Sequence, residues 1–308
     1  MRLLHVGIFN HVEGQPSLRR ALNSISDLYI EYNYDSHLKN INEIIMRDVA
    51  RHHVDVVFMQ IQRANVIKIS TLIALRNKGV KVFNFTGDVR QPLEKWYIDT
   101  APYVTTLFTN NHDVETLQRL GYNAVYFQVG YNVEYYNKFD QPQPNAPDIV
   151  FFGNNYGTLF PLSQYRQDMV AFLKNRYGNK FKVYGNGWEG AENLNANQCK
   201  EGAIYRGCKI AINLSHFDLD RYSSDRLFRI LGSGAFCLSH NYKNIELEFK
   251  HKKDLCVWNN FDELAELIDY YLEHEEQRRI IALTGNKNCE QNFTWDKRME
   301  QFKTLIEA

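Results

Sequence analysis

An arginine that opens a helix directly after a buried strand is the residue in this sequence best placed to hold an anion. The segment Tyr222–Ser239 predicts a polar loop, a helix from Asp225 that stops at Gly234, and a short apolar strand. Another apolar strand is predicted just before it, at Lys209–Ser215. Backbone N–H groups and the positive end of the helix dipole attract phosphate at such a helix start. Arg226 could add a bidentate contact to the same phosphate.

Small and polar residues follow the other strands predicted in the second half of the chain. Two glycine-bearing turns, Gly153–Gly157 and Tyr184–Trp188, each come after an apolar run. Glycine lets the backbone approach a phosphate closely, although a strand-end glycine is often a plain turn and the tryptophan could simply be packed. We expect the ligand-binding residues of this half to be Gly153, Asn154, Tyr184, Gly185, Gly187, Trp188, Asn213, Ser215, Ser223, Ser224, Arg226, Ser233 and Gly234.

The first half of the chain offers candidates for a general base. His11 and Glu13 follow the first predicted strand, and Asp88 follows a later one. A histidine has an unperturbed pKa of about 6.5, which suits it to take a proton from a hydroxyl group. Asp88 and Arg90 could instead form a helix-capping pair, and a loop histidine is often only a surface residue. We expect the catalytic residues of this half among Asp88, His11 and Glu13.

Strand-like and helix-like segments alternate along the whole chain. Strands are expected at residues 3–9, 28–32, 54–59, 80–85, 104–109, 124–127, 149–152, 181–184, 209–215, 235–239 and 255–258. Helices are expected at residues 17–25, 40–51, 68–78, 113–120, 165–176, 201–206, 225–233, 260–273, 276–286 and 295–306. Short apolar runs separated by such helices predict right-handed β-α-β units and parallel sheets, so the fold class is α/β.

The best domain boundary is a proline-rich segment near the middle of the chain. Three of the seven prolines fall between Lys138 and Asp148, and proline continues neither a helix nor a central strand. We therefore expect two Rossmann-like domains, residues 1–140 and 148–308, that face each other across a ligand-binding cleft. Helices close the chain, and the last of them could pack back on the first domain.

Amino-acid composition limits the partners and the cellular compartment that we expect for the protein. The 308 residues include 36 basic and 36 acidic side chains, so a net charge of zero does not favour a nucleic acid or an anionic membrane as partner. Five cysteines without a C-x-x-C pair suggest reduced thiols. The chain begins on a strand-like run, and no apolar stretch reaches the ~20 residues that span a bilayer. We expect a cytoplasmic protein with no transmembrane segment.

The segment around Arg226 resembles the donor-binding segment of GT-B glycosyltransferases, particularly the group 1 and spore-maturation (CgeB-like) family. That family carries an S-x-R-x-F-E-x-x-A-x-G pattern at the pyrophosphate of its sugar nucleotide. Ser224, Arg226, Phe228 and Gly234 match this pattern, whereas Arg229 stands where the family has a glutamate. Later motifs follow the family order as well, so the resemblance covers residues 150–302, about half of the chain.

The resemblance implies a glycosyltransferase that moves a sugar from a UDP-, GDP- or dTDP-linked donor to a hydroxyl group of a glycan, small molecule or protein. The donor would lie in the second domain and the acceptor in the first. It implies no metal, although Asp218 and Asp220 have the spacing of a D-x-D metal motif. One alternative is a phage-type enzyme that glycosylates modified DNA bases, aided by a basic patch of Arg19, Arg20, Arg47, Arg51 and Lys78. Another is a non-catalytic protein of the same fold that only binds a sugar nucleotide, which the loss of the glutamate would favour.

Overall fold

The computed structural model describes residues 1–9, 14–89, 91–194 and 197–307. Their contacts divide the chain into two compact units. The first unit comprises Met1–Gly130 and Trp295–Ala308, and the second comprises Tyr131–Thr294. In the described part of the chain, no helix has both the length and the apolar character needed to cross a membrane.

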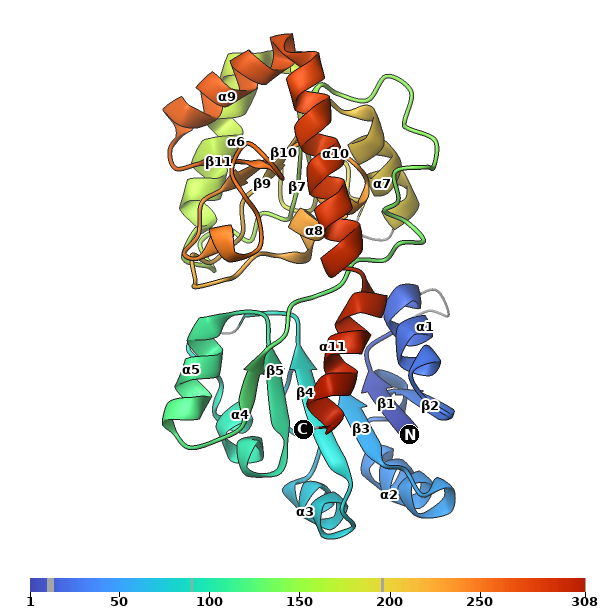
Figure 1. The fold of residues 1–308 in the computed structure, drawn as a ribbon. Coiled ribbons are helices and arrows are strands. Elements are labelled where there is room, and N and C mark those ends of the chain that lie inside the picture. The colour runs from blue at the N-terminus through green and yellow to red at the C-terminus, as the bar shows by residue number, and fades with distance from the viewer. Residues whose placement is uncertain (10–13, 90, 195–196, 308) are drawn as a thin grey trace. The chain divides into compact units, whose positions relative to one another are not determined.

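The first unit is built around a parallel sheet with helices on its faces (Figure 1). Its six strands run in the order β2-β1-β3-β4-β5-β6. The strands are β1 (Arg2–Gly7), β2 (Leu28–Asn33), β3 (Val56–Met59), β4 (Lys81–Thr86), β5 (Thr105–Phe108) and β6 (Ala124–Tyr126). The helices are α1 (Pro16–Ser24), η1 (Tyr34–His37), α2 (Ile41–His52), α3 (Ile69–Asn77), α4 (Lys95–Thr100), η2 (Ala101–Tyr103), α5 (Asn111–Arg119) and α11 (Trp295–Glu307).

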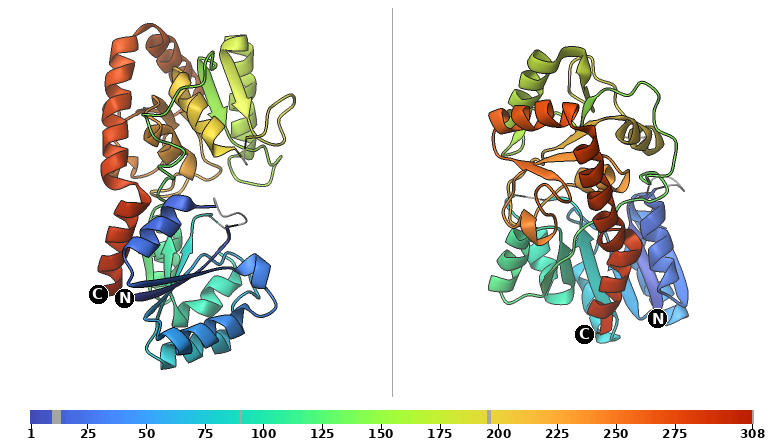
Figure 2. Two further views of the ribbon diagram at one scale, coloured as in Figure 1. Left: turned by 90° about the vertical axis from the view of Figure 1, so that its right-hand side faces the viewer. Right: turned by 45° about the horizontal axis from the view of Figure 1, so that its top comes forward.

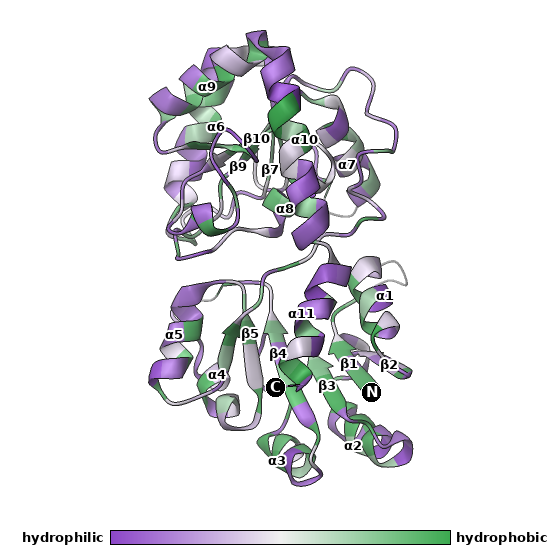
Figure 3. Cartoon of the chain, viewed as in Figure 1, coloured by the Kyte–Doolittle hydropathy of each residue, from purple (hydrophilic) through white to green (hydrophobic). Residues whose placement is uncertain are grey.

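Apolar side chains on the strands hold this unit together. All residues of β3 and nearly all of β1 are buried, and Figure 3 shows both strands as hydrophobic. The last helix, α11, lies beside α1 (Figure 2) and covers one face of the sheet. Its Phe302 ring packs edge-on against Phe58 and Phe83, with ring centroids 5.1 and 4.9 Å apart. The C-terminal helix is therefore part of the first unit although it follows the second unit in sequence.

The second unit repeats the same plan with five strands. Its parallel sheet has the order β11-β10-β9-β7-β8. The strands are β7 (Ile149–Phe152), β8 (Phe181–Tyr184), β9 (Ile210–Asn213), β10 (Cys237–His240) and β11 (Cys256–Trp258). The helices are α6 (Ser163–Tyr177), η3 (Gly178–Lys180), α7 (Gln198–Gly207), α8 (Asp225–Gly232), η4 (Ile245–Leu247), α9 (Phe261–Glu273) and α10 (Glu275–Asn292).

Local signals in the sequence explain several helix ends. Asn260 immediately precedes α9, and its side chain caps the helix by accepting a hydrogen bond of 2.9 Å from the backbone N–H of Glu263. Gly234 has a φ of 76° just beyond α8, a left-handed conformation that stops a helix at low cost. The predicted segments at residues 225–233 and 260–273 therefore form helices for the reasons that the sequence suggests.

The expected linker at Lys138–Asp148 lies inside the second unit, which corrects the domain boundary. The backbone N–H of Gln143 donates to the carbonyl oxygen of Ala203 at 2.7 Å, and Lys138 pairs with Glu290 at 3.1 Å. These contacts attach the proline-rich segment to α7 and α10. The boundary falls at residue 130, because prolines mark irregular backbone and irregular backbone can still pack against a domain.

In each sheet the first strand of the unit has later strands on both of its sides. In the first unit β1 lies between β2 and β3, and in the second unit β7 lies between β8 and β9. The loops after β1 and β3, and those after β7 and β9, therefore leave in opposite directions. In parallel α/β sheets such a point opens a crevice at the carboxyl ends of the strands, where ligands bind. The carboxyl edges of the two sheets are therefore the expected positions of ligand-binding sites.

Candidate functional site

Two guanidinium groups meet at the end of β7, at the carboxyl edge of the second sheet. Gly153 is the first residue after this strand. A Cβ atom placed on it would lie 2.5 Å from Nη2 of Arg166 and 2.9 Å from Nη2 of Arg226. Only a glycine leaves room for both groups against the backbone at this point.

Arg226 enters the site from the first turn of α8. Its Nη1 donates to the carbonyl oxygen of Leu214 at 3.0 Å and to Oγ of Ser224 at 3.2 Å, and its Nε donates to the carbonyl oxygen of Phe152. The residue is only 9% exposed. Within the described residues no hydrogen bond occupies Nη2, so one arm of the guanidinium fork is left for a ligand.

Arg166 enters from α6, and the sequence did not single it out. It is 1% exposed, and its Nη2 donates to the carbonyl oxygen of Asn154 at 3.2 Å. Its Nη1 shares the carbonyl oxygen of Leu214 with Arg226, while its buried Nε has no partner among the described residues. Burial, followed by the nearby charge of Arg226, holds the pKa of Arg166 well below its usual value. The site therefore contains two cations that repel each other.

Among the described residues, no carboxylate pairs with either of these two guanidinium groups. Both arginines donate to backbone carbonyls or to a serine hydroxyl, and neither forms an ion pair within the described part of the chain. Taking a charge out of water costs several kcal/mol unless a counter-ion is present. An unpaired pair of guanidinium groups at the start of a helix is therefore suited to an anion with two negative charges, such as a diphosphate.

Small polar side chains hold the start of α8 in place. Nδ2 of Asn213, at the end of β9, donates to Oγ of Ser239 at 3.0 Å and to Oγ of Ser223 at 3.3 Å. Oγ of Ser215 accepts a hydrogen bond of 3.1 Å from the backbone N–H of Ser224. The structure thus brings Asn213, Ser215, Ser223, Ser224 and Arg226 together, and their binding of a ligand stays a prediction.

The two glycine turns, which follow β7 and β8, pack against each other beside the two guanidinium groups. Gly185 has a φ of 131°, and a Cβ atom on it would lie 2.5 Å from the carbonyl oxygen of Gly153. Gly187 has a φ of 80°, and its Cβ would lie 2.3 Å from the carbonyl oxygen of Asn155. Oδ1 of Asn154 accepts a hydrogen bond of 2.9 Å from the backbone N–H of Asn186. These glycines allow the loops after β7 and β8 to come close together.

The aromatic residues of the second turn are packed. Nε1 of Trp188 donates to the carbonyl oxygen of Gly153 at 2.6 Å, and its ring packs against the hydrophobic core. Tyr184 is 3% exposed and stacks on Phe152, with ring centroids 4.4 Å apart. Their contacts assign both residues to the support of the Gly153 turn, which is the packing alternative considered for Trp188.

Ser233 and Gly234 lie away from this cluster, at the other end of α8. Eight residues of helix separate Ser224 from Ser233, which corresponds to roughly 12 Å at 1.5 Å per residue. A Cβ atom on Gly234 would lie 2.9 Å from Cβ of Lys138. The predicted ligand contacts of these two residues are corrected here: Gly234 ends the helix and packs against Lys138, because the helix carries them away from the carboxyl edge.

Arg229 forms ion pairs within the second unit. Its Nη1 lies 3.2 Å from Oε2 of Glu201, its Nη2 pairs with Asp225, and its guanidinium lies over the ring of Tyr136 at 5.5 Å. Tyr136 also donates to Glu201 at 3.0 Å. The arginine that replaces the expected glutamate is thus neutralised by a carboxylate from α7, and it differs from Arg226 in this respect.

The two aspartates with D-x-D spacing have separate environments. Asp220 lies 2.9 Å from Nζ of Lys243 and accepts two hydrogen bonds from Asn244, at 2.8 and 2.9 Å. Asp218 raises the pKa of His240, which burial lowers. Across the described ranges, no three His, Cys, Asp or Glu side chains are grouped in a way that could hold a metal ion.

In the first unit the carboxyl edge of the sheet carries Asp88. This residue follows β4, its side chain is exposed, and its carbonyl oxygen accepts a hydrogen bond of 2.9 Å from Thr86. His11, Glu13 and Arg90 lie outside the described residues, so the other predicted bases have no structural account. Asp88 is therefore the one candidate for the base whose position is known.

A neutral polar network lies beside the start of the first loop. Nε2 of His5 is 2.8 Å from Oε1 of Gln60, and Nε2 of Gln60 donates to Oε1 of Gln15 at 2.9 Å. Gln15 in turn donates to the carbonyl oxygen of Ile8 at 2.8 Å. Burial lowers the pKa of His5 to about 4, which keeps its ring uncharged. No sequence pattern singles these residues out, because glutamine and histidine are common on surfaces.

The basic patch considered for DNA binding is largely neutralised. Arg19 pairs with Glu31, Arg20 with Asp296 at 2.7 Å, and Arg47 with Asp48 at 2.7 Å. Charges that are already paired release few counterions when they meet a nucleic acid. The first unit therefore offers little support for a DNA acceptor.

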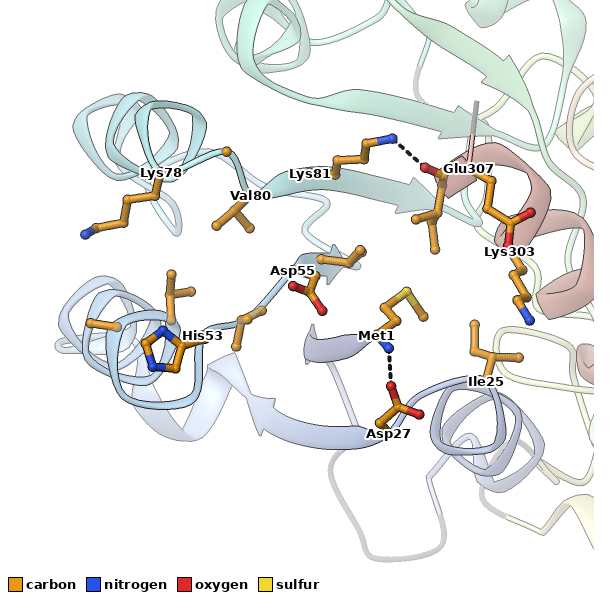
Figure 4. Close-up of a pocket in the computed structure, with 16 residues that line it drawn as sticks. Met1, Ile25, Asp27, His53, Asp55, Lys78, Val80, Lys81, Lys303 and Glu307 are labelled. Carbon is orange, nitrogen blue, oxygen red and sulfur yellow. Dashed lines mark hydrogen bonds and ion pairs between the residues drawn. The ribbon is translucent and has the colours of Figure 1, made fainter.

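A hollow of about 1010 Å³ lies at the amino edge of the first sheet (Figure 4). Several of its polar groups already have partners: the amino group of Met1 pairs with Asp27, Nζ of Lys81 donates to the carbonyl oxygen of Ile306, and Asp55 accepts from the backbone N–H of Arg2 at 2.7 Å. Ligands of doubly wound sheets bind at the opposite, carboxyl edge. We assign no function to this hollow.

Comparison with solved structures identifies the fold. A glycosyltransferase from Rickettsia africae ESF-5 superposes with a TM-score of 0.63 at 13% identity, over 99% of this chain and 98% of that one. HepE from Anabaena, in complex with UDP, gives 0.63 at 10% identity over the whole of both chains. OtsA in its apo form gives 0.65 at 11% identity, over 100% of this chain and 99% of that one. The protein therefore has the GT-B fold of two Rossmann-like units.

Sequence comparison finds similarity to one family over slightly less than half of the chain. Residues 166–304 match the family described as glycosyl transferase-like. This range begins at Arg166 and includes Arg226, the two arginines of the site. No curated protein sequence matches the chain. The matched range comprises residues 166–294 of the second unit and residues 295–304 of the first.

Proposed function

We propose that the carboxyl edge of the second sheet binds the diphosphate of a sugar nucleotide, and that the enzyme transfers the sugar to a hydroxyl acceptor. The observation that carries this proposal is the pair of buried guanidinium groups, Arg166 and Arg226, without a carboxylate partner in the described chain. The complex of HepE with UDP supports a nucleoside diphosphate as the ligand class. A UDP-, GDP- or dTDP-linked sugar is the proposed donor.

The two arginines also explain how the reaction would be accelerated. As the bond between the sugar and the diphosphate breaks, negative charge develops on the leaving phosphate. Guanidinium groups that are already fixed and desolvated stabilise this charge without reorganisation. Arg226 and the start of α8 therefore act on the leaving group and need no metal for this purpose.

The first unit is proposed to hold the acceptor. Asp88 lies at the carboxyl edge of its sheet, and with His11 and Glu13 it is the proposed source of the base that takes the acceptor's proton. The acceptor is a glycan, a small molecule or a protein. Membership of the narrower spore-maturation (CgeB-like) branch is part of the same proposal, as is a cytoplasmic location, which five free cysteines favour.

Calorimetric titration with UDP, GDP, dTDP and CDP tests the donor site. We expect one of these diphosphates to bind the purified protein clearly more tightly than the others. Failure of all four to bind would overturn the proposal. Hydrolysis of the matching sugar nucleotide without an acceptor then separates an enzyme from a binding protein, because only an enzyme releases the sugar.

A further inference from the structure

His216 lies beside the two guanidinium groups and has no assigned role in the site. It follows β9, two residues after Leu214, whose carbonyl oxygen accepts hydrogen bonds from both arginines. Its ring packs against Tyr156 and Phe160, with centroids 5.3 and 4.8 Å apart. Its Nδ1 is buried and has no hydrogen-bond partner in the part of the chain that the structure describes. A buried ring nitrogen without a partner is an available group for a ligand.

In the described part of the chain, the charged groups that influence His216 are both positive. Arg166 approaches from α6 and Arg226 from α8, while the loop after β7 contributes Tyr156 and Phe160. Asp218, two residues further along the loop, acts on His240 instead. Burial and then the two guanidinium groups lower the pKa of His216 to about 3, so the ring is neutral near pH 7.

We propose that His216 is a third binding residue of the diphosphate site, which takes up a proton as the anion enters and then donates it in a hydrogen bond to a phosphate oxygen. This inference rests on the proposed function of the site. The proton comes from solvent, and no covalent bond is made or broken. The ligand class is a diphosphate diester, as found in a sugar nucleotide.

The physical reason is a change in the charge that surrounds the ring. Two negative charges placed between Arg166 and Arg226 cancel the repulsion that disfavours an imidazolium ion. A charged N–H donor then gains a charge-assisted hydrogen bond to phosphate. If the bound state holds its proton more tightly than the free state, binding takes up a proton and strengthens as the pH falls.

Calorimetry in buffers of different ionisation enthalpy measures this proton directly. The probe is whichever of UDP-glucose, GDP-mannose and dTDP-glucose binds most tightly. A sugar nucleotide is preferred to a free diphosphate, because a terminal phosphate monoester has its own pKa of about 6 and would exchange protons itself. The wild-type enzyme is expected to take up protons at pH 6 and fewer at pH 8.

Two variants assign the proton to His216. In His216→Gln the buffer dependence should disappear, and affinity should fall about tenfold at pH 6 but little at pH 8. His240→Gln is the matched control, since His240 is also partly buried with a lowered pKa but is influenced by Asp218 and not by the arginines. Its proton uptake should equal that of the wild type.

The outcomes are distinct. A binding heat that is independent of buffer in the wild type, or proton uptake that survives in His216→Gln, would overturn the role of His216 while leaving the diphosphate site in place. A lack of any binding heat with all three sugar nucleotides would instead overturn the proposed function together with this inference. Wild-type proton uptake that is lost only in His216→Gln supports the proposal.

Discussion

The carboxyl edges of the two sheets have the same topology and opposite chemistry. In the second unit the edge holds two buried guanidinium groups, Arg166 and Arg226, that donate to backbone carbonyls and have no counter-ion in the described chain. In the first unit the corresponding edge holds His5, Gln60 and Gln15 in a hydrogen-bonded network of uncharged groups. One fold therefore presents two guanidinium groups at the edge of one unit, and at the edge of the other an uncharged hydrogen-bonded network together with the exposed carboxylate of Asp88.

This difference fits the two substrates of a glycosyl transfer. A diphosphate needs fixed positive charge, which the second unit supplies at a cost in desolvation. A hydroxyl acceptor needs groups that orient it and a base that takes one proton, which amide side chains and a carboxylate can supply. Under the proposed function, the shared topology would place a ligand at each carboxyl edge, and the side chains would decide which ligand binds there.

The largest expected effect comes from removing the base in the first unit. Asp88→Asn keeps the shape and hydrogen bonding of the side chain but cannot take a proton. If Asp88 is the base, kcat should fall by about 10² to 10⁴, while binding of the diphosphate stays nearly unchanged. Steady-state kinetics and calorimetry on the same variant measure both quantities. If His11 is the base, His11→Ala should show this loss, and Asp88→Asn should mainly raise the KM for the acceptor.

Asp55→Asn provides a control for this experiment. Asp55 is exposed in the same unit but lies before β3, at the amino edge of the sheet. Its replacement should leave kcat unchanged. Near-normal kcat in both Asp88→Asn and His11→Ala would show that another group, such as Glu13 or the donor phosphate, accepts the proton.

The next largest effect is expected in the second unit. Arg226→Ala removes the proposed charge-assisted contact to the leaving diphosphate, and such a contact is worth roughly 1.5–3 kcal/mol. Donor affinity or rate should therefore fall about ten- to a hundredfold. Titration with the diphosphate and initial-rate kinetics measure the loss, and wild-type values for both would refute the site.

Arg206→Ala is the matched control for Arg226→Ala. The guanidinium of Arg206 also donates to backbone carbonyls, those of Tyr135, Asn137 and Gln141. It belongs to the last turn of α7, away from the carboxyl edge. Replacing Arg206 should affect stability but leave diphosphate binding as it is, so an equal loss in both variants would indicate a structural effect.

The sequence predicted the architecture and one of the two arginines. Alternating apolar runs and helices gave the two α/β units, because each strand is buried and each helix covers a sheet. Arg226 was predicted because it opens a helix after a strand. The domain boundary was placed too late, since prolines at residues 142–147 mark irregular backbone without showing which unit it packs against.

Arg166 was missed because its role depends on a tertiary contact: α6 and α8 are far apart in sequence, but their arginines lie side by side in the fold. A signal was present: Arg166 lies on the same helical stripe as the buried residues Met169, Val170 and Leu173. A charged residue at spacing i, i+3, i+4 and i+7 with apolar ones points into the protein. Ser233 was predicted in error because it belongs to the same sequence motif as Ser224. The motif includes the whole of α8, so the two residues lie at opposite ends of that helix.

A smaller effect is expected from pH on the first unit. The ring of His5 is fully buried, and its pKa of about 4 in the folded protein lies below the value of about 6.5 expected after unfolding. The unfolded state therefore binds a proton first as the pH falls. The contribution of His5 to the free energy of unfolding is therefore fully present above pH 6.5 and decreases toward pH 4. Between pH 7.5 and 5.5 it falls by roughly 1.3 kcal/mol. Amide hydrogen exchange of β1 and β3, corrected for intrinsic rates, measures this loss.

The His5→Gln variant should lack this part of the pH dependence, even if it is less stable at every pH. His112→Gln serves as the control, because His112 is exposed on α5 of the same unit and its replacement should leave the pH dependence unchanged. An unaltered slope in His5→Gln would show that the neutral network at this edge does not depend on an uncharged His5.

The smallest effect is expected from removing divalent metal. Arg166 and Arg226 already place two positive charges where a metal ion would otherwise neutralise the diphosphate, and a third cation there would add to the repulsion between them. Asp220, the second aspartate of the D-x-D pair, is held by Lys243 and Asn244. Transfer rates measured in EDTA and in added Mg²⁺ or Mn²⁺ should therefore agree within about twofold, a free-energy difference below 1 kcal/mol. Loss of activity in EDTA that Mn²⁺ restores would make Asp218 and Asp220 ligands, and the cationic edge of the second unit would then need a metal as well as its arginines.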